Sequence, residues 1–192
     1  MSSPAPESTL TAFAGFRRIA SGPRAEVIAK LRKLRRHAED AAPFVFDDAT
    51  GDRLDLDLRH GPAPAAAATP SEGQTARGVG RPRLGVVARE VTLLPRHWEW
   101  LGRQPGGASV ALRRLVDEAR RVHAGRDAER GAREATYRFM TAIAGDLPGF
   151  EDATRALFAG DRSRFDELVA PWPQDLRTHL HKLAAAAWSA AS

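Results

Sequence analysis

The residues whose types and spacing most clearly suggest chemistry are arginines in the middle of the chain. Residues 77–121 contain 10 arginines against four acidic residues, a local net charge of +6, whereas the whole chain of 192 residues carries +5. A local excess of positive charge is the pattern expected of a surface that binds a polyanion such as nucleic acid. The alternative is a solvated basic surface without a partner, and charge alone does not distinguish the two.

Aspartates and histidines are the other candidates for chemistry. Asp47, Asp48 and Asp52 form an Asp-Asp-x-x-Gly-Asp segment whose carboxylates suit a divalent cation. The segment lacks the spacing of a calcium loop, however, and aspartate is common in turns for backbone reasons. His179 and His181 lie two residues apart on a predicted helix and point in different directions, so we expect exposed surface histidines rather than shared metal ligands.

Sequence motifs of known enzymes are missing from the chain. It contains no Walker loop, no Gly-x-Ser-x-Gly elbow and no His-Glu-x-x-His motif. We therefore expect no catalytic residues, no metal and no cofactor.

The basic segment carries a characteristic order of elements at residues 81–122. Residues 86–94 are β-rich and end at Pro95, which is favoured in the first turn of a helix. That helix stops at the Gln-Pro-Gly-Gly sequence of residues 104–107, and Ser109 is a suitable cap for a second helix. Strand, short helix, glycine turn and longer helix is the order of the ribbon-helix-helix superfamily, which the segment resembles. The second helix carries an apolar stripe at Leu112, Leu115, Val116, Ala119 and Val122.

This resemblance implies a homodimer in which two chains pair their strands into a ribbon that enters the major groove of DNA. One strand and two short helices bury too little surface to stand alone. The second helix would direct its free N-terminal amides toward a phosphate. The arm before the strand contains the Gly-Arg-Pro core of a minor-groove AT-hook, although so short a match also fits an ordinary basic linker. The expected DNA-binding residues are Arg81, Arg83, Arg89, Thr92, Arg96, Gly107, Ser109, Arg113 and Arg114.

The strand differs from the superfamily pattern in which of its positions are polar and which are apolar. Members usually carry polar, base-reading residues two and four positions before the helix-starting proline, where this chain has Leu93 and Val91. A β-bulge would restore the phase. Without a bulge the outward face carries Ala88, Glu90 and Thr92. This departure affects base-specific readout more than phosphate binding.

The N-terminal segment predicts a small mixed unit. Residues 10–21 read as one short strand, and Ser21 and Pro23 start a helix that runs to about residue 37. Residues 44–46 and 54–58 form two further strands, joined by the aspartate-rich turn. The order of this unit is β-α-β-β.

The remaining segments complete an α+β architecture. Residues 61–80 are rich in Pro, Ala and Gly and predict a flexible linker. Residues 126–190 read as three or four helices with aromatic and leucine core stripes. The expected organisation is a β-α-β-β unit at 1–60, the linker at 61–80, the ribbon-helix-helix-like module at 81–122 and a helical C-terminal region at 123–192.

Over nearly its full length the chain resembles a bacterial family catalogued as domain of unknown function 2239. The resemblance rests on the order of the blocks TAFAGFRRIASG, VFDDATGDRLDLDLR, REVTLLPRHWEWL with QPGGAS, and FMTAIAGDLPGFEDATRALFAGDRSRF. It implies lineage and architecture, and it brings no activity with it.

The leading hypothesis is a DNA-binding protein of the transcriptional-regulator kind that acts as a homodimer. The absence of cysteine excludes disulfides and thiolate sites. Without a signal-like N-terminus or an apolar run of membrane length, we expect a cytoplasmic protein with no membrane partner. The alternative is a protein-interaction module, antitoxin-like or a scaffold, that lacks affinity for DNA. A metal-dependent or other enzyme ranks third.

Overall fold

The computed structural model of the chain describes residues 9–35, 43–56, 87 and 89–188. Two compact units make up the chain, and the statements below concern those described residues. Unit one comprises residues 1–60 and 123–192, and unit two comprises residues 61–122. No helix in the described part is both long and apolar enough to cross a membrane.

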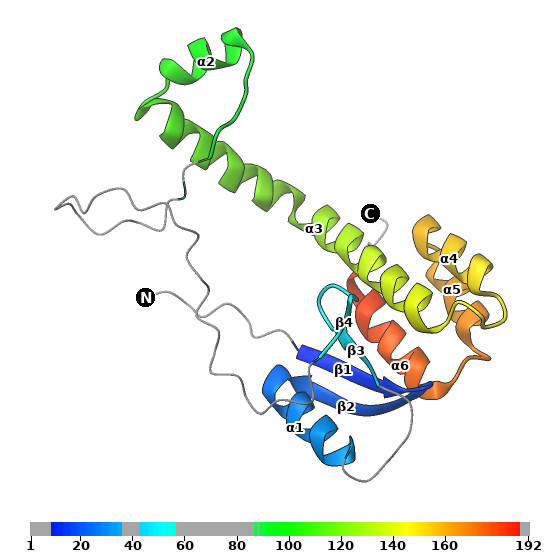
Figure 1. Cartoon of the computed structure of the whole chain (residues 1–192). Coiled ribbons are helices and arrows are strands. Elements are labelled where there is room, and N and C mark those ends of the chain that lie inside the picture. The colour runs from blue at the N-terminus through cyan, green and yellow to red at the C-terminus, as the bar shows by residue number, and fades with distance from the viewer. Residues whose placement is uncertain (1–8, 36–42, 57–86, 88, 189–192) are drawn as a thin grey trace. The chain divides into compact units, whose positions relative to one another are not determined.

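Unit one contains a four-stranded antiparallel sheet with the strand order β2-β1-β3-β4 (Figure 1). Its strands are β1 (Thr9–Ala14), β2 (Arg17–Pro23), β3 (Phe44–Asp47) and β4 (Arg53–Leu54). The prediction of one strand at residues 10–21 is wrong, because a hairpin divides it. Gly15 adopts a positive φ of 56° at the turn, a conformation that glycine allows without steric cost.

The first helix, α1 (Arg24–Arg35), follows β2 directly. The predicted helix start at Ser21 is therefore wrong, because Ser21 belongs to β2 and pairs with Thr11 of β1. Val27 and Leu31 of α1 are buried against residues of the sheet, whereas Leu34 of the same helix is exposed. The strand expected at residues 54–58 is shorter than predicted, and its last two residues lie outside the described part.

The opposite face of the sheet packs against C-terminal helices. These are the C-terminal part of α3 (Gly107–Ile143) and α6 (Gln174–Leu183), while α4 (Phe150–Ala159), α5 (Arg162–Val169) and the short η1 (Ala184–Ala186) complete the same core. Phe13 and Phe46 of the sheet contact Phe139 of α3. Residues 1–60 and 123–192, which the sequence suggested as separate segments, thus share one core.

Unit two contains α2 (Pro95–Gly102) and the N-terminal part of α3. As predicted, α2 begins at Pro95 and a glycine turn follows it. Residues 89–94 form no strand within this chain. The backbone hydrogen bonds of a ribbon-helix-helix ribbon would run between two chains and would not occur within a single chain. The arm residues Arg81 and Arg83 lie outside the described part.

Helix α3 is continuous over 37 residues. The sequence suggested that the module's second helix ends near residue 122 and that a new helix begins near residue 126, and this expectation is wrong. Residues 122–132 contain no proline, and alanine, arginine and glutamate favour helix there. Gly125 and Gly131 cost about 1 kcal/mol each, which is too little to break a helix that is anchored further on.

Candidate nucleic-acid interface

A glycine turn shapes the start of α3. Gly106 and Gly107 have φ values of 83° and 75°, which strongly disfavour other residues. The N–H of Gly107 donates to the carbonyl of Gln104 across 3.0 Å and closes the turn. A Cβ on Gly107 would meet no atom within 4 Å, so the backbone here is open to an approaching group.

The first turns of α3 carry positive charge without a compensating acid. No acidic residue lies in the first turn, and Ser109, Arg113 and Arg114 are exposed. The Arg113 Nε donates to the carbonyl of Ser109 across 3.1 Å, which directs this arginine back along the helix toward its N-terminus. The helix dipole and the N-terminal amides favour an anion at the same end.

Arginines of unit two lack ion-pair partners among the described residues. Seven are exposed, and none forms an ion pair with another described residue. In unit one, by contrast, six arginines pair with carboxylates, for example Arg164 with Glu167 at 3.0 Å and Arg130 with Asp127 at 2.9 Å. The seven are Arg89, Arg96, Arg103, Arg113, Arg114, Arg120 and Arg121.

Several of the predicted DNA-binding residues thus share one helix end. Gly107, Ser109, Arg113 and Arg114 lie within the first two turns of α3. Arg96 lies in the first turn of α2, and Arg89 and Thr92 are exposed on the segment that precedes it. Arg103 was not named as a DNA-binding residue from the sequence, although its position next to the glycine turn indicates such a role.

A buried polar cluster in unit one was also not anticipated. The Asp48 side chain is only 3% exposed. Its Oδ1 accepts a hydrogen bond from Thr11 Oγ1 at 2.7 Å, and its Oδ2 accepts one from Lys182 Nζ at 2.7 Å. Asp47 fulfils the turn role predicted for this segment, because its Oδ1 accepts from the backbone N–H of Ala49 at 2.8 Å. Asp48 instead joins the sheet to α6.

His179 occupies the core beside this carboxylate. It is 1% exposed, between the rings of Phe13 and Phe139, whose centroids lie 5.5 and 4.6 Å from its own. Its Nε2 lies 3.7 Å from Asp48 Oδ1, and neither ring nitrogen has a hydrogen-bond partner. Burial lowers the pKa of His179 from 6.5 to about 4, against the opposing charge of Asp48, and Lys182 lowers it further.

The sequence prediction of two exposed histidines therefore holds only for His181. His179 falls three residues after Leu176 and four before Leu183, so it belongs to the buried stripe of α6. Among the described residues, no group of three or more His, Asp or Glu side chains is arranged to hold a metal ion.

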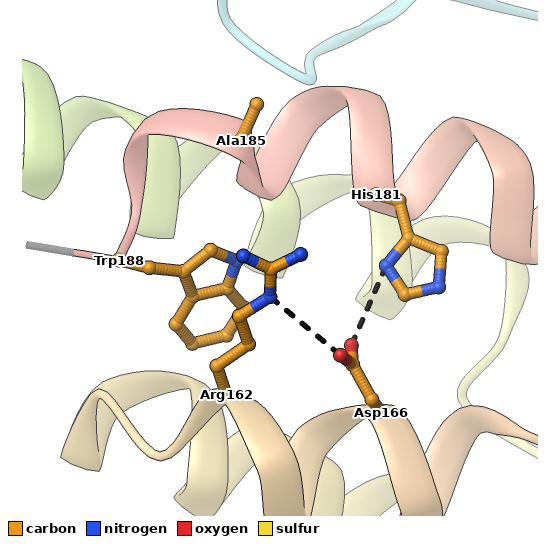
Figure 2. A pocket seen from close by; sticks show the side chains of 5 residues that line it. All are labelled: Arg162, Asp166, His181, Ala185 and Trp188. Carbon is orange, nitrogen blue, oxygen red and sulfur yellow. Dashed lines mark ion pairs between the residues drawn. The ribbon is translucent and has the colours of Figure 1, made fainter.

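A surface hollow of about 480 Å³ lies between α5 and the C-terminal end of the fold. Figure 2 shows Asp166 between Arg162 and His181, with Trp188 at one side. Asp166 Oδ2 lies 3.6 Å from Arg162 Nε, and Oδ1 lies 3.5 Å from His181 Nδ1. These contacts link α5 to α6 through partly exposed groups, and the positive and negative charges nearly balance.

Comparison with known proteins places the chain within a family. No curated protein and no solved structure matches it significantly. A sequence profile described as "Uncharacterized protein conserved in bacteria (DUF2239)" matches residues 9–184, which is most of the chain. The match includes the sheet, the glycine turn and the helices α1 to α6. The chain therefore belongs to the bacterial DUF2239 family.

Proposed function

We propose that this chain is a DNA-binding protein, of the transcriptional-regulator kind, that contacts the phosphate backbone through unit two. The observation that carries the proposal is the set of seven exposed arginines that have no ion-pair partner in the described chain. An exposed arginine without an ion-pair partner attracts a polyanion with its full charge. In an arginine that is paired with a carboxylate, the negative charge of the carboxylate largely cancels that attraction.

Each candidate residue has a specific role in the proposal. The open turn at Gly107 lets a phosphate approach the first amides of α3, and the Ser109 hydroxyl adds a donor. Arg113 and Arg114 supply charge one turn further along. Arg89 and Thr92 lie on the segment that would form the ribbon of a ribbon-helix-helix homodimer and enter the major groove.

The proposal also includes Arg81 and Arg83 of the arm, which lie outside the described residues, as contacts to DNA. The proposal places the protein with DNA in the cytoplasm and assigns no reaction to it. Base-specific readout depends on which side chains leave the ribbon, since Val91 and Leu93 stand where polar readers are expected.

A second function is favoured by a different observation. Leu94, Trp98 and Trp100 are all exposed in unit two, and tryptophan is enriched where proteins bind one another. A protein-interaction module without DNA affinity would use this apolar surface and leave the arginines in water. The two functions make opposite predictions for DNA binding.

A fluorescence-anisotropy titration of a labelled duplex with the full chain tests the proposal. We expect binding at low salt that weakens steeply between about 50 and 200 mM salt, because neutralised phosphates release counterions. The double variant Arg113→Glu, Arg114→Glu should lower affinity about tenfold or more and reduce the slope of the salt dependence.

The matched control reverses two arginines of unit one, Arg155→Glu with Arg164→Glu. Both are exposed and paired with acids in their own helices, and such surface pairs contribute little to stability. This variant should bind the duplex nearly as the unaltered chain does. No binding by the unaltered chain at low salt would refute the proposal and favour the protein-interaction module.

A further inference from the structure

Unit two buries few apolar side chains and exposes many. Among its described residues only Leu101 and Ala111 are fully buried hydrophobics. Nine larger apolar side chains are exposed in the same unit: Val87, Val91, Leu94, Trp98, Trp100, Val110, Leu115, Val116 and Val122. A folded unit with so small a core needs an additional apolar surface to cover it.

The uncovered surface continues along α3 as a regular stripe. Leu112, Leu115, Val116, Ala119 and Val122 recur at spacings of three and four residues, so they lie on one face of the helix. Every residue from 113 to 128 is exposed, with Val116 at 55% and Val122 at 71%. The described residues therefore leave this part of α3 largely uncovered, although its pattern is that of a packed helix.

We propose that the residue 112–122 stripe of α3 packs against the same stripe of a second copy of the chain, with the two helices antiparallel. This inference rests on the dimer of the proposed function and assigns to it a surface on α3. It extends the contact beyond the paired ribbon segments, which end before α2.

The sequence of the stripe matches itself when the second helix is reversed. When two copies of the helix run antiparallel and are centred on residue 117, Leu112 of one copy lies opposite Val122 of the other. Leu115 of one copy then lies opposite Ala119 of the other. At both of these levels an apolar side chain meets another, as the core layers of antiparallel helix pairs require, while Val116 lies at the level of Glu118 of the other copy. The small Ala119 permits close approach of the two backbones.

The small core of unit two also favours a second copy over a transient partner. Because only Leu101 and Ala111 are fully buried among its described hydrophobics, the unit requires cover whenever it is folded. A second copy is present wherever the chain is made, whereas a partner that comes and goes would leave the surface in water.

Light scattering coupled to size-exclusion chromatography on the full chain tests the inference. We expect a mass of twice the 20.8 kDa of one chain. Val116→Glu and Val122→Glu should each raise the dimer dissociation constant at least about tenfold. Because both side chains are exposed within the single chain, neither change disturbs its own fold, and circular dichroism should show unaltered helix content.

The matched control is Phe158→Glu on α4, whose side chain is 48% exposed in unit one. This variant removes a comparably exposed hydrophobic residue and should remain dimeric. An unaltered chain that elutes at the mass of one copy overturns the inference, as does a Val116→Glu variant with unchanged dimer affinity. A stable dimer that fails to bind DNA refutes only the proposed function.

Cross-linking locates the contact independently of affinity, since the chain has no cysteine of its own. Ala119→Cys places one thiol near the centre of the stripe and should join two copies through a short thiol-reactive linker. Ala124→Cys places the thiol on the same helix but off the stripe and should give little product. Equal cross-linking at both positions would contradict the antiparallel pairing.

Discussion

At the scale of single residues, the polar side chains buried in unit one act mainly to hold the sheet against α6. Asp48 binds Thr11 of β1 and Lys182 of α6 with its two oxygens, and Asp175 of α6 accepts a hydrogen bond from the backbone N–H of Arg18 in β2 at 2.9 Å. Residues 175 and 182 lie seven positions apart and therefore face the same direction. One face of α6 thus supplies polar contacts to β2 and to the turn after β3.

His179 lies between these contacts and makes stability depend on pH. Its pKa is lowered from 6.5 to about 4 in the folded chain, so the unfolded chain binds a proton more readily between those values. The contribution of His179 to the free energy of unfolding is therefore most favourable above pH 6.5 and falls as pH decreases toward 4. The groups that face the ring are Asp48, which favours protonation, and Lys182 and Arg18, which oppose it.

We predict that His179→Phe removes this part of the pH dependence. Phenylalanine fits among Phe13 and Phe139 and leaves no unsatisfied ring nitrogen, so the variant should equal or exceed the unaltered chain in stability at pH 7.5. Its advantage should grow by about 2 to 3 kcal/mol on going to pH 4.5. Urea denaturation at several pH values measures this difference, and parallel curves for the two proteins would contradict it.

At the scale of elements, the β3–β4 hairpin is fixed to α3 by a close backbone approach. Gly51, in the turn, has a φ of 70°, and a Cβ placed on it would lie 1.9 Å from the carbonyl oxygen of Ala135 in α3. Arg138 of the same helix also reaches the turn, at 3.4 Å from Asp52. The hairpin and the helix therefore cannot separate to admit a side chain without losing these contacts.

We predict that Gly51→Ala destabilises the protein by about 3 kcal/mol or more, because both the positive φ and the collision with backbone must be relieved. The matched control is Gly125→Ala in α3, where a Cβ meets no atom within 4 Å. Alanine there should stabilise the helix by about 1 kcal/mol. Thermal denaturation of both variants checks the pair, and a Gly51→Ala protein as stable as the unaltered chain would show that the turn is not tightly packed.

Local signals predicted the elements that depend on local sequence. The turn at Asp47, the helix start at Pro95 and the glycine turn before α3 all follow from neighbouring residues. The pairing of β1 with β3 joins residues more than thirty positions apart, and no local pattern specifies it. For the same reason the burial of His179 by Phe13 was not foreseen, since one residue belongs to α6 and the other to the first strand.

The candidate interface shows the same division. Composition located the basic segment, and the structure adds that its described arginines are exposed and lack ion-pair partners there. The length of α3 was underestimated because a helix boundary was inferred where the apolar stripe ends, and exposed stretches can remain helical when both ends are anchored.

At the scale of the whole molecule, charge and apolar surface are distributed unequally between the units. Unit one neutralises many of its cations within its own helices and contains the large aromatic core. Unit two exposes unpaired arginines together with uncovered apolar side chains. A unit that keeps both features exposed is suited to two contacts at once, one with a polyanion and one with an apolar surface.

If both proposals hold, self-association and DNA binding are separable at the level of residues but linked in energy. A dimer brings two sets of arginines to one duplex, so the second set binds at high effective concentration. We therefore predict that Val116→Glu, which keeps every arginine, weakens DNA binding about tenfold or more and makes it depend more steeply on protein concentration. Arg113→Glu with Arg114→Glu should lose affinity while remaining dimeric. Anisotropy titrations and light scattering on the same samples measure both properties, and a monomeric Val116→Glu protein with undiminished DNA affinity would show that one copy of unit two suffices.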